Sequence, residues 1–403
     1  MQTDLADFIK DTPEGREANA ILRACVHCGF CTATCPTYQL LGNELDGPRG
    51  RIYLIKQVLE GHEPTTRTQM HLDRCLTCRA CETTCPSGVK YGRLADIGRR
   101  VVEEKTRRPL AQKIQRRVMR AILPHESRFT PLLKLGRLVR SLLPGALRGS
   151  ITRAQTPGDW PEPRHARRML VLDGCVQPGL APRINAATAR VLDHAGISLV
   201  RAQGAGCCGA LSYHLTAQAE GLDFMRRLID AWWPHVESGV EAIVTTASGC
   251  GVVVKEYGHL LRNDERYADK AARIGSMTRD IAEVLANTDV SPLKRPTRKV
   301  AFHSPCTLQH GQKLNGVVEE LLQKCGFELT PVADAYLCCG SAGTYSILQQ
   351  RLSGRLLANK LETLESGAPE QIVTANIGCL VHLQSRAQVP VTHWIELLDV
   401  SSD

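Results

Sequence analysis

The sequence predicts a multidomain protein with a helical N-terminal domain, a basic helical linker and two duplicated α/β units with parallel strands. Three observations lead to this fold class. A run of four cysteines at 25–35 recurs at 75–85. From about residue 169, strand-like apolar runs alternate with helical patterns, and the series occurs twice. Between these parts, residues 99–168 contain 18 Lys and Arg and 5 Asp and Glu, whereas the rest of the chain contains 32 and 36.

The two cysteine runs have the spacing that wraps a 4Fe–4S cluster. They read CVHCGFCTATCP and CLTCRACETTCP, with three cysteines three residues apart, a fourth four residues later and then a proline. Such a loop presents three thiolates to one cluster, while its fourth cysteine serves the other cluster. The spacing therefore predicts an exchange, in which one cluster is held by Cys25, Cys28, Cys31 and Cys85 and the other by Cys75, Cys78, Cys81 and Cys35.

Helical patterns flank these cysteine runs. Apolar residues recur at helical spacing over residues 4–24, and again over 52–61 after a helix breaker at Gly47-Pro48. Residues 1–98 are therefore expected to form an α-helical ferredoxin domain with two 4Fe–4S clusters.

Residues 99–168 are expected to be a linker of cationic amphipathic helices. The stretches IQRRVMRAILP and PLLKLGRLVRSLLPGALRG alternate aliphatic residues with arginine. Such helices suit an anionic membrane surface, where apolar side chains enter the lipid and arginines meet the phosphates. The alternative is a pair of ordinary helices whose apolar faces pack on the protein and whose arginines are solvated. Nucleic acid is not expected as a partner, because no aromatic residues are interleaved with the arginines and no reading motif is present.

The composition limits the class of protein further. No window reaches the roughly 18 consecutive apolar residues that a membrane span requires, and the N-terminus, MQTDLADFIKDTPEG, lacks the pattern of a secretory signal. We therefore expect the protein in the cytoplasm, where thiols stay reduced. Its 17 cysteines then indicate metal or redox chemistry and not a disulfide scaffold.

The C-terminal part carries a second, duplicated set of cysteines. Two units, 169–295 and 296–403, each contain a CCG motif, and their equivalent cysteines are 131, 131 and 129 residues apart. Each cysteine follows a strand, at the edge where α/β folds place their sites. We therefore expect two matching sites for an iron–sulfur centre, zinc or thiol chemistry. One comprises Cys175, Cys207, Cys208 and Cys250, and the other comprises Cys306, Cys338, Cys339 and Cys379.

Paired cysteine runs followed by doubled CCG motifs resemble the iron–sulfur subunits of membrane-linked flavin dehydrogenases. With the segment ELDGPRGRIYLIKQVLEG between the runs and the basic linker, the whole chain looks most like the family of glycolate oxidase iron–sulfur subunits. The resemblance implies an electron-transfer subunit that works with FAD-containing subunits, which oxidise glycolate to glyoxylate. It also implies electron delivery to a membrane quinone and a peripheral position on the inner face of the cytoplasmic membrane. The alternatives that share these motifs are the lactate-utilisation and anaerobic glycerol-3-phosphate dehydrogenase subunits and heterodisulfide reductase.

The sequence departs from one of these alternatives. Heterodisulfide reductase closes each CCG unit with Cys-x-x-Cys, but Val253 and His382 occupy the last position here. A thiol–disulfide enzyme is therefore less expected, and His382 is more simply a surface or core residue than a ligand. No dinucleotide fingerprint or phosphate-binding loop is present, so we expect no catalytic residues and no cofactor-binding residues beyond the cluster ligands. The odd cysteine, Cys325, lies among apolar residues at helical spacing and is expected in the core.

Overall fold

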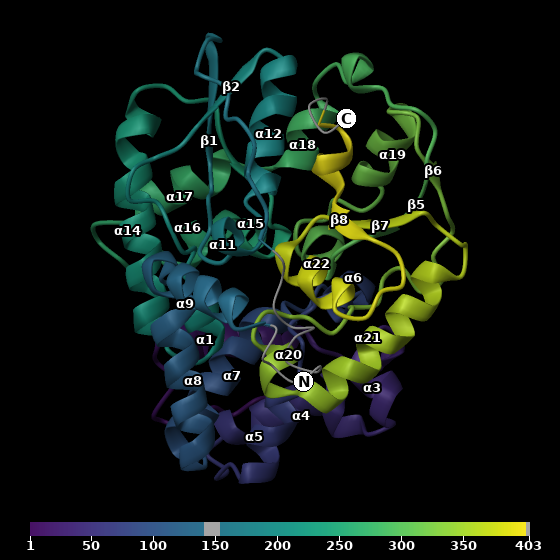
Figure 1. Ribbon diagram of the computed structural model, residues 1–403. Helices are drawn as coiled ribbons and strands as arrows, with labels where there is room; N and C mark the ends of the chain where they lie inside the picture. The colour runs from purple at the N-terminus through teal and green to yellow at the C-terminus, as the bar shows by residue number, and fades with distance from the viewer. Residues whose placement is uncertain (141–153, 400–403) are drawn as a thin grey trace. The chain divides into compact units, whose positions relative to one another are not determined.

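The computed structural model describes residues 1–140 and 154–399, which divide into two compact units. The first unit comprises Met1–Arg116 and Asp334–Lys360, and the second comprises Arg117–Ala333 and Leu361–Asp403. The described part of the first unit is helical, and both sheets belong to the second unit (Figure 1).

Short helices joined by cysteine-containing loops make up the first unit. Up to residue 105 they are α1 (Pro13–Ala24), α2 (Phe30–Ala33), α3 (Pro36–Leu41), η1 (Glu44–Asp46), α4 (Pro48–Leu59), α5 (Thr66–Asp73), α6 (Ala80–Thr84) and α7 (Tyr91–Lys105). The second segment of this unit contains α20 (Tyr345–Leu348) and most of α21 (Gln350–Glu365). Helices α1, α4 and α7 pack around buried aliphatic side chains such as Leu22, Ile55 and Leu94. The predicted helical N-terminal fold is confirmed, and α4 is the helix predicted over 52–61.

The first helix is shorter than the helix predicted over 4–24. It begins at Pro13, and Thr12 caps it, because Thr12 Oγ1 accepts a hydrogen bond from the backbone N–H of Gly15 at 2.9 Å. Proline is favoured at the first helical position, where a backbone N–H would have no partner inside the helix. Residues 7–11 form turns instead. The apolar spacing before Thr12 was therefore wrongly interpreted as helical.

Two four-stranded parallel sheets of the same topology lie in the second unit. Their strand orders are β2-β1-β3-β4 and β6-β5-β7-β8. In the first sheet Met169 pairs with Leu199 and Ala242, and in the second Val300 pairs with Leu329 and Gln371. The strands are β1 (Arg167–Val171), β2 (Ile197–Val200), β3 (Ala242–Thr245), β4 (Thr278–Asp280), β5 (Lys299–His303), β6 (Glu328–Leu329), β7 (Gln371–Thr374) and β8 (Val391–His393). This arrangement confirms the predicted pair of duplicated α/β units.

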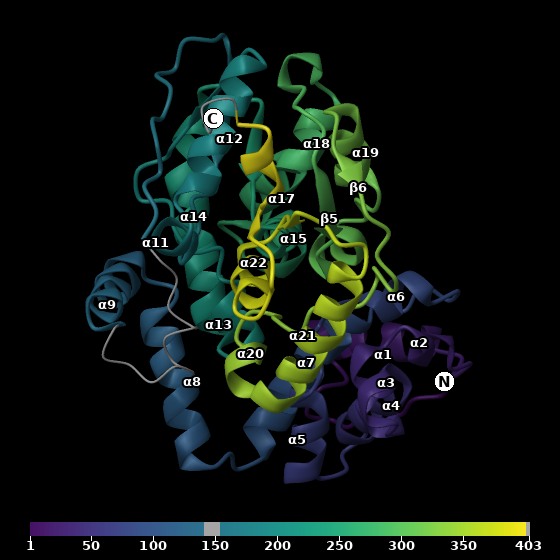
Figure 2. The same cartoon turned by 45° about the vertical axis from the view of Figure 1, so that its right-hand side comes forward.

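Helices flank both sheets (Figures 1 and 2). In the first half these are α11 (Gln177–Leu180), α12 (Arg183–His194), α13 (Ala210–His214), α14 (Gln218–Glu237), α15 (Ser248–Lys255), α16 (Tyr257–Leu260), α17 (Ala268–Met277) and α18 (Ile281–Ala286). The second half has η3 (Ser291–Leu293), η4 (Thr307–Gly311), α19 (Val317–Lys324), α22 (Ile377–Gln384) and η5 (Trp394–Leu397). Trp232 and Trp394 are fully buried in these halves, and so is Cys325, as predicted.

Hydrogen bonds join the two halves of the second unit. The backbone N–H of Ser248 donates to the carbonyl of Ala375 at 3.2 Å, and Nε2 of His393 lies 2.9 Å from the carbonyl oxygen of Thr246. Desolvation lowers the pKa of the fully buried His393 to about 4, so the ring is neutral and its Nε2–H donates to Thr246. Helix α18 of the first half and α19 of the second lie side by side in both views (Figures 1 and 2).

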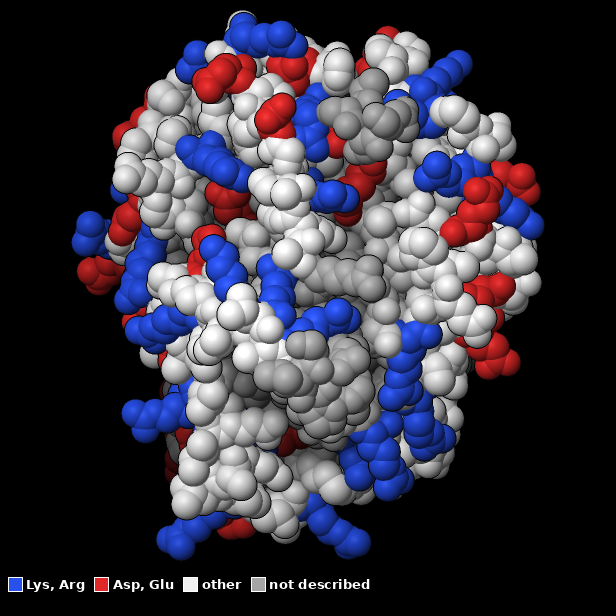
Figure 3. All heavy atoms as spheres, viewed as in Figure 1, with Lys and Arg blue, Asp and Glu red and all other residues white. Residues whose placement is uncertain are grey.

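The basic linker forms α8 (Leu110–Ile122) and α9 (Glu126–Leu138), as its alternating pattern predicted. The end of the second predicted helix falls within 141–153, outside the described residues. On α8, three side chains four residues apart share one face and are exposed, namely Leu110 at 73%, Ile114 at 54% and Val118 at 48%. Figure 3 shows an uncharged area where α8 lies, with Lys and Arg side chains at its edges. Among the described residues, no helix is long and apolar enough to span a bilayer.

Candidate metal centres

The two cysteine loops of the first unit have the same backbone conformation. Each loop turns twice through the left-handed region, at His27 and Gly29 in the first and at Thr77 and Arg79 in the second. These residues stand two and four positions after the first cysteine of each run, so each turn aims successive thiols toward one point. A short helix follows each loop, α2 and α6 respectively, and the two helices pack against each other.

The packing of α2 on α6 carries the last cysteine of each run to the other loop. Thr34 and Thr84 each stand directly before that cysteine, and their hydroxyl oxygens are 3.2 Å apart. Cys35 and Cys85 follow directly, and Pro36 opens α3 after Cys35. The exchange of these two cysteines between the clusters stays a prediction.

The first hollow gathers the thiols of one predicted set. It has an empty volume of about 430 Å³, open to solvent, and its lining includes Cys25, Cys28, Cys31 and Cys85. Cys28 is exposed, whereas Cys25 is buried. Burial, and then the neighbouring thiol of Cys25, raises the pKa of Cys31 to about 11, so a free thiolate is disfavoured there. A bound cation reverses that preference, because thiolate is the form that ligates metal.

The second hollow gathers the other predicted set. It has an empty volume of about 300 Å³, and its lining includes Cys35, Cys75, Cys78 and Cys81. Cys35 and Cys81 are buried. Burial raises the pKa of Cys81, and the thiols of Cys78 and Cys75 add to this effect.

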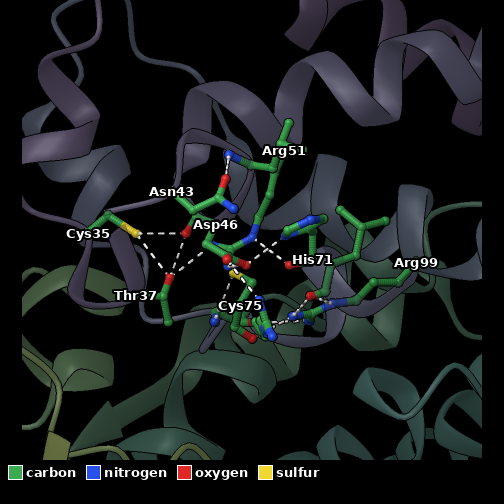
Figure 4. A network of polar contacts seen from close by, with 12 residues as sticks. Cys35, Thr37, Asn43, Asp46, Arg51, His71, Cys75 and Arg99 are labelled. Atoms are coloured by element: carbon green, nitrogen blue, oxygen red, sulfur yellow. Dashed lines mark hydrogen bonds and ion pairs between the residues drawn. The ribbon is translucent and has the colours of Figure 1, made fainter. Parts of the chain in front are cut away.

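Cys75 differs from the other thiols of the second hollow. Its sulfur accepts hydrogen bonds from the backbone N–H of Thr77 at 3.4 Å and from the hydroxyl of Tyr91 at 3.5 Å. Burial raises its pKa, but Arg51, Arg99 and the hydrogen bonds from Tyr91 and Thr77 together outweigh burial, and the pKa of Cys75 is lowered overall. Negative charge at Cys75 is therefore stabilised by nearby cations and donors, and Figure 4 shows the surrounding network.

These two hollows suit the group that the spacing predicts. Soft thiolate sulfurs, four to a site in a tight pocket, form the donor set of a 4Fe–4S cluster. The sequence analysis missed the surrounding polar residues: Thr37, Asp46, Arg51, His71, Tyr91 and Arg99. In the sequence these residues look like ordinary surface residues. The one indication of their role was that ELDGPRGR lies close to the first cysteine run, and this segment supported only the family resemblance.

The first CCG unit also brings its four cysteines together. Hydrogen bonds link Cys207 to Cys175 and to Cys208, and link Cys208 to Cys250. The bonds from Cys207 and Cys250 lower the pKa of Cys208. Bonds with Cys175 and then with Cys208 raise the pKa of Cys207, and the bond with Cys208 raises the pKa of Cys250. Gly209 has φ +83°, and a Cβ there would lie 2.4 Å from the carbonyl oxygen of Gly221. Only glycine therefore allows the CCG turn to pack so closely.

The second CCG unit repeats these local features. The backbone N–H of Gly340 donates to Cys338 Sγ at 3.4 Å, just as Gly209 donates to Cys207 at 3.4 Å. Cys338 and Cys339 are buried in the segment 334–360 of the first unit. Cys306 and Cys379 lie in the second unit, each after a strand, and both are buried.

Two histidines of the second CCG unit lie three residues from its cysteines in the sequence, His303 before Cys306 and His382 after Cys379. His303 ends β5, is 1% exposed, and places a ring nitrogen within 4.8 Å of Cys379 Sγ. Asn376 Nδ2 donates to the same sulfur at 3.6 Å. His382 lies on α22, partly exposed, and Val253 belongs to the apolar core of the first half. Metal ligation by any of the eight CCG-unit cysteines stays a prediction.

Comparisons with known proteins agree with this architecture. A family model described as a 4Fe–4S dicluster domain matches residues 21–89, and a model described as a cysteine-rich domain matches residues 169–255 and 300–384. Two 4Fe–4S clusters are therefore cofactors of this chain, as predicted.

Relatives are similar along nearly the whole length. The glycolate oxidase iron–sulfur subunit of Escherichia coli (strain K12) is 57% identical over 402 residues, covering 99% of this chain and 98% of the relative. The probable glycolate oxidase iron–sulfur subunit of Bacillus subtilis (strain 168) is 31% identical, covering 89% and 88%. Lactate utilization protein A of the same Bacillus subtilis strain is 25% identical, and the match covers 56% of this chain and 96% of that relative. The chain belongs to the family of glycolate oxidase iron–sulfur subunits.

Proposed function

We propose that this chain accepts electrons from FAD-containing subunits that oxidise glycolate to glyoxylate, and passes them toward a membrane quinone. Membership of the family supports a role in an oxidoreductase complex. Glycolate oxidation releases two electrons and two protons, which a flavin accepts together. Iron–sulfur clusters then carry the electrons one at a time. The observation that carries the proposal is the pair of cysteine-lined hollows within one unit, of which Cys81 lines both. The hydroxy acid is oxidised on the partner, since the sequence has no flavin or nicotinamide motif.

The ligand sets form part of this proposal. Cys25, Cys28, Cys31 and Cys85 hold the first cluster, and Cys35, Cys75, Cys78 and Cys81 hold the second. The domain division 1–98, 99–168, 169–295 and 296–403 belongs to it as well. The four linked thiols of the first CCG unit support a further metal or iron–sulfur site there, with the second unit as its counterpart.

Helix α8 supports the membrane side of the proposal. Its exposed face of Leu110, Ile114 and Val118 is bordered by cationic residues such as Lys113 and Arg117. Apolar side chains with nearby cations favour adsorption to anionic lipid. The protein would then be peripheral on the inner face of the cytoplasmic membrane, close to the quinone pool.

Affinity purification of the tagged chain from its own cells tests the partner. The eluate is assayed with glycolate, lactate and glycerol 3-phosphate. We expect a flavoprotein to co-purify and glycolate to reduce its flavin fastest. Faster reduction by lactate or by glycerol 3-phosphate would assign the chain to the corresponding complex instead. Disulfide turnover without a flavoprotein would make it a thiol–disulfide enzyme.

Binding to anionic vesicles tests the surface. The variant with Leu110→Ser, Ile114→Ser and Val118→Ser should leave vesicles of phosphatidylglycerol, while the control Phe8→Ser, an exposed apolar residue outside α8 (46% exposed), should remain bound. Equal binding of both variants would remove α8 from the proposal.

A further inference from the structure

We propose that the cluster held by Cys35, Cys75, Cys78 and Cys81 has the higher reduction potential of the two, because the buried Arg51, the half-buried Arg74 and Arg99 and hydrogen-bond donors lie around it. An electron delivered by the flavoprotein then comes to rest on this second cluster. The inference rests on the proposed ligand sets, and concerns the order of the relay within this chain.

Reduction adds one negative charge to a cluster, so nearby positive charge favours the reduced form. Arg51 and Asp46 are each 1% exposed, and Arg51 Nη2 lies 3.7 Å from Asp46 Oδ1. The same carboxylate accepts from Arg74 at 2.9 Å and contacts His71 Nδ1 at 2.9 Å. One buried carboxylate therefore faces two guanidinium groups, and positive charge remains in excess beside the second hollow, whose lining includes Arg51.

Arg99 adds a third cation from α7. Its guanidinium donates to three neutral oxygens: the carbonyls of Leu72 and Cys75, at 3.0 and 2.6 Å, and Thr77 Oγ1 at 2.8 Å. The bond to the Cys75 carbonyl places this charge on the ligand residue itself. Figure 4 shows Thr37 close to Cys35, Asp46 between Cys35 and His71, and Arg99 on the side of Cys75 that is away from Cys35.

Hydrogen bonds to ligand sulfur act in the same sense, since they withdraw negative charge from the cluster. Cys75 Sγ accepts from Tyr91 Oη at 3.5 Å and from the backbone N–H of Thr77 at 3.4 Å. Thr37 Oγ1 lies 3.3 Å from Cys35 Sγ, accepts from Arg51 Nη1 at 3.1 Å and donates to the carbonyl of Asp46 at 2.8 Å. The donors to sulfur are therefore concentrated on Cys75, while Thr37 links Arg51 to the surroundings of Cys35.

The first hollow has a different environment. Two cations also lie near its loop: the Met1 ammonium donates to the carbonyl of Cys25 at 2.8 Å, and Arg49 reaches Gly29. Arg49 Nε is paired with Glu44 at 2.7 Å, and both of these side chains are partly exposed. Solvent screens such a charge pair, whereas charges in a dry interior act at full strength. Burial alone would lower the potential of the second cluster. Arg51 lines the second hollow and Arg99 donates to the carbonyl of Cys75 at 2.6 Å, so these close cations oppose the effect of burial and determine the order.

Redox titration of the anaerobically purified full chain, followed by electron paramagnetic resonance, measures both midpoint potentials without glycolate. The signal that survives in the Cys28→Ala/Cys85→Ala variant assigns the second cluster. We expect the second cluster to have the higher midpoint potential. Arg99→Gln should lower it by about 59 mV, a tenfold change in the equilibrium constant for a one-electron couple, and leave the first cluster unshifted.

Three variants separate charge from structure. Arg99→Lys keeps the charge and should restore most of the potential. Arg100→Gln removes a charge from the next residue of α7, which is paired with Glu104 at 2.9 Å and Glu14 at 3.2 Å, and should shift neither cluster. Tyr91→Phe should lower the potential of the second cluster by a smaller amount than Arg99→Gln. If Arg99→Gln does not retain iron, Tyr91→Phe is the variant that tests the inference.

Two results would overturn the inference: a second cluster with the lower potential, or fully loaded Arg99→Gln and Tyr91→Phe proteins whose potentials match that of Arg100→Gln. Failure of the ligand proposal is distinguishable, because Cys28→Ala/Cys85→Ala would then keep no intact cluster.

Discussion

The exchange of Cys35 and Cys85 between the two cysteine runs can be tested by pairing substitutions. A cluster that loses one thiolate often survives with fewer irons, so single variants are ambiguous. The double variant Cys28→Ala/Cys85→Ala removes two thiols from the first hollow and none from the second. If each run instead completed its own cluster, the same variant would remove one ligand from each.

The expected magnitude follows from the two sets of four thiols. The unaltered ferredoxin domain holds about eight irons. Exchange predicts that Cys28→Ala/Cys85→Ala retains one fully ligated cluster, with about four irons. The matched variant Cys78→Ala/Cys85→Ala removes one ligand from each set and should retain no fully ligated cluster.

Iron analysis and the resonance signal of the dithionite-reduced protein measure both variants, with iron in the CCG units determined separately in a Cys28→Ala/Cys78→Ala/Cys85→Ala/Cys35→Ala background. The opposite pattern, an intact cluster in Cys78→Ala/Cys85→Ala and none in Cys28→Ala/Cys85→Ala, would refute the exchange and support ligation within each run.

Two further predictions concern the CCG units. Gly209→Ala forces a side chain into φ +83° and onto a carbonyl oxygen 2.4 Å away, so it should destabilise the protein by about 2 kcal/mol or more. The control Gly204→Ala, at φ +81° in open space, should destabilise it by about 1 kcal/mol. Equal losses of stability of the two variants in thermal denaturation would contradict this prediction. For His393, the folded pKa of about 4 lies below the unfolded 6.5, so the unfolded chain binds more protons between these values and stability falls as pH drops from 6.5 toward 4. Between pH 7 and 5 this loss of stability is about 2 kcal/mol. It should disappear in His393→Gln, which keeps a donor for Thr246. If the apparent Tm of His393→Gln had the same pH dependence as that of the unaltered protein, His393 would not titrate this way.

Much of the fold could be predicted because its signals are local. Two cysteine runs with identical spacing predict identical loops, and the structure gives both the same left-handed turns, with His27 matched by Thr77. The equal spacing of the CCG motifs likewise predicted two duplicated α/β units with parallel strands, and the two sheets have the same strand order. The error at 4–24 is also local: the pattern of apolar residues indicated burial, but Thr12 and Pro13 determine where the helix begins.

The environment of the clusters could not be predicted in the same way. Asp46 and Arg51 read as surface charges in ELDGPRGR, and only the folded chain brings them together with His71 from α5. Burial of such a group depends on partners that are distant in sequence. The interactions of Arg99 with Leu72 and Cys75 are equally nonlocal. Spacing therefore predicts the two ligand sets, while the charges beside them required the structure.

The central claim is that electrons from glycolate pass through the clusters of this chain. The most direct measurement adds glycolate anaerobically to the purified complex and follows the flavin and cluster signals together. We expect the signal of the second cluster to appear after flavin reduction and to disappear when quinone is added. A reduced flavin beside clusters that stay oxidised, with quinone reduction continuing, would contradict the proposed electron path through this chain.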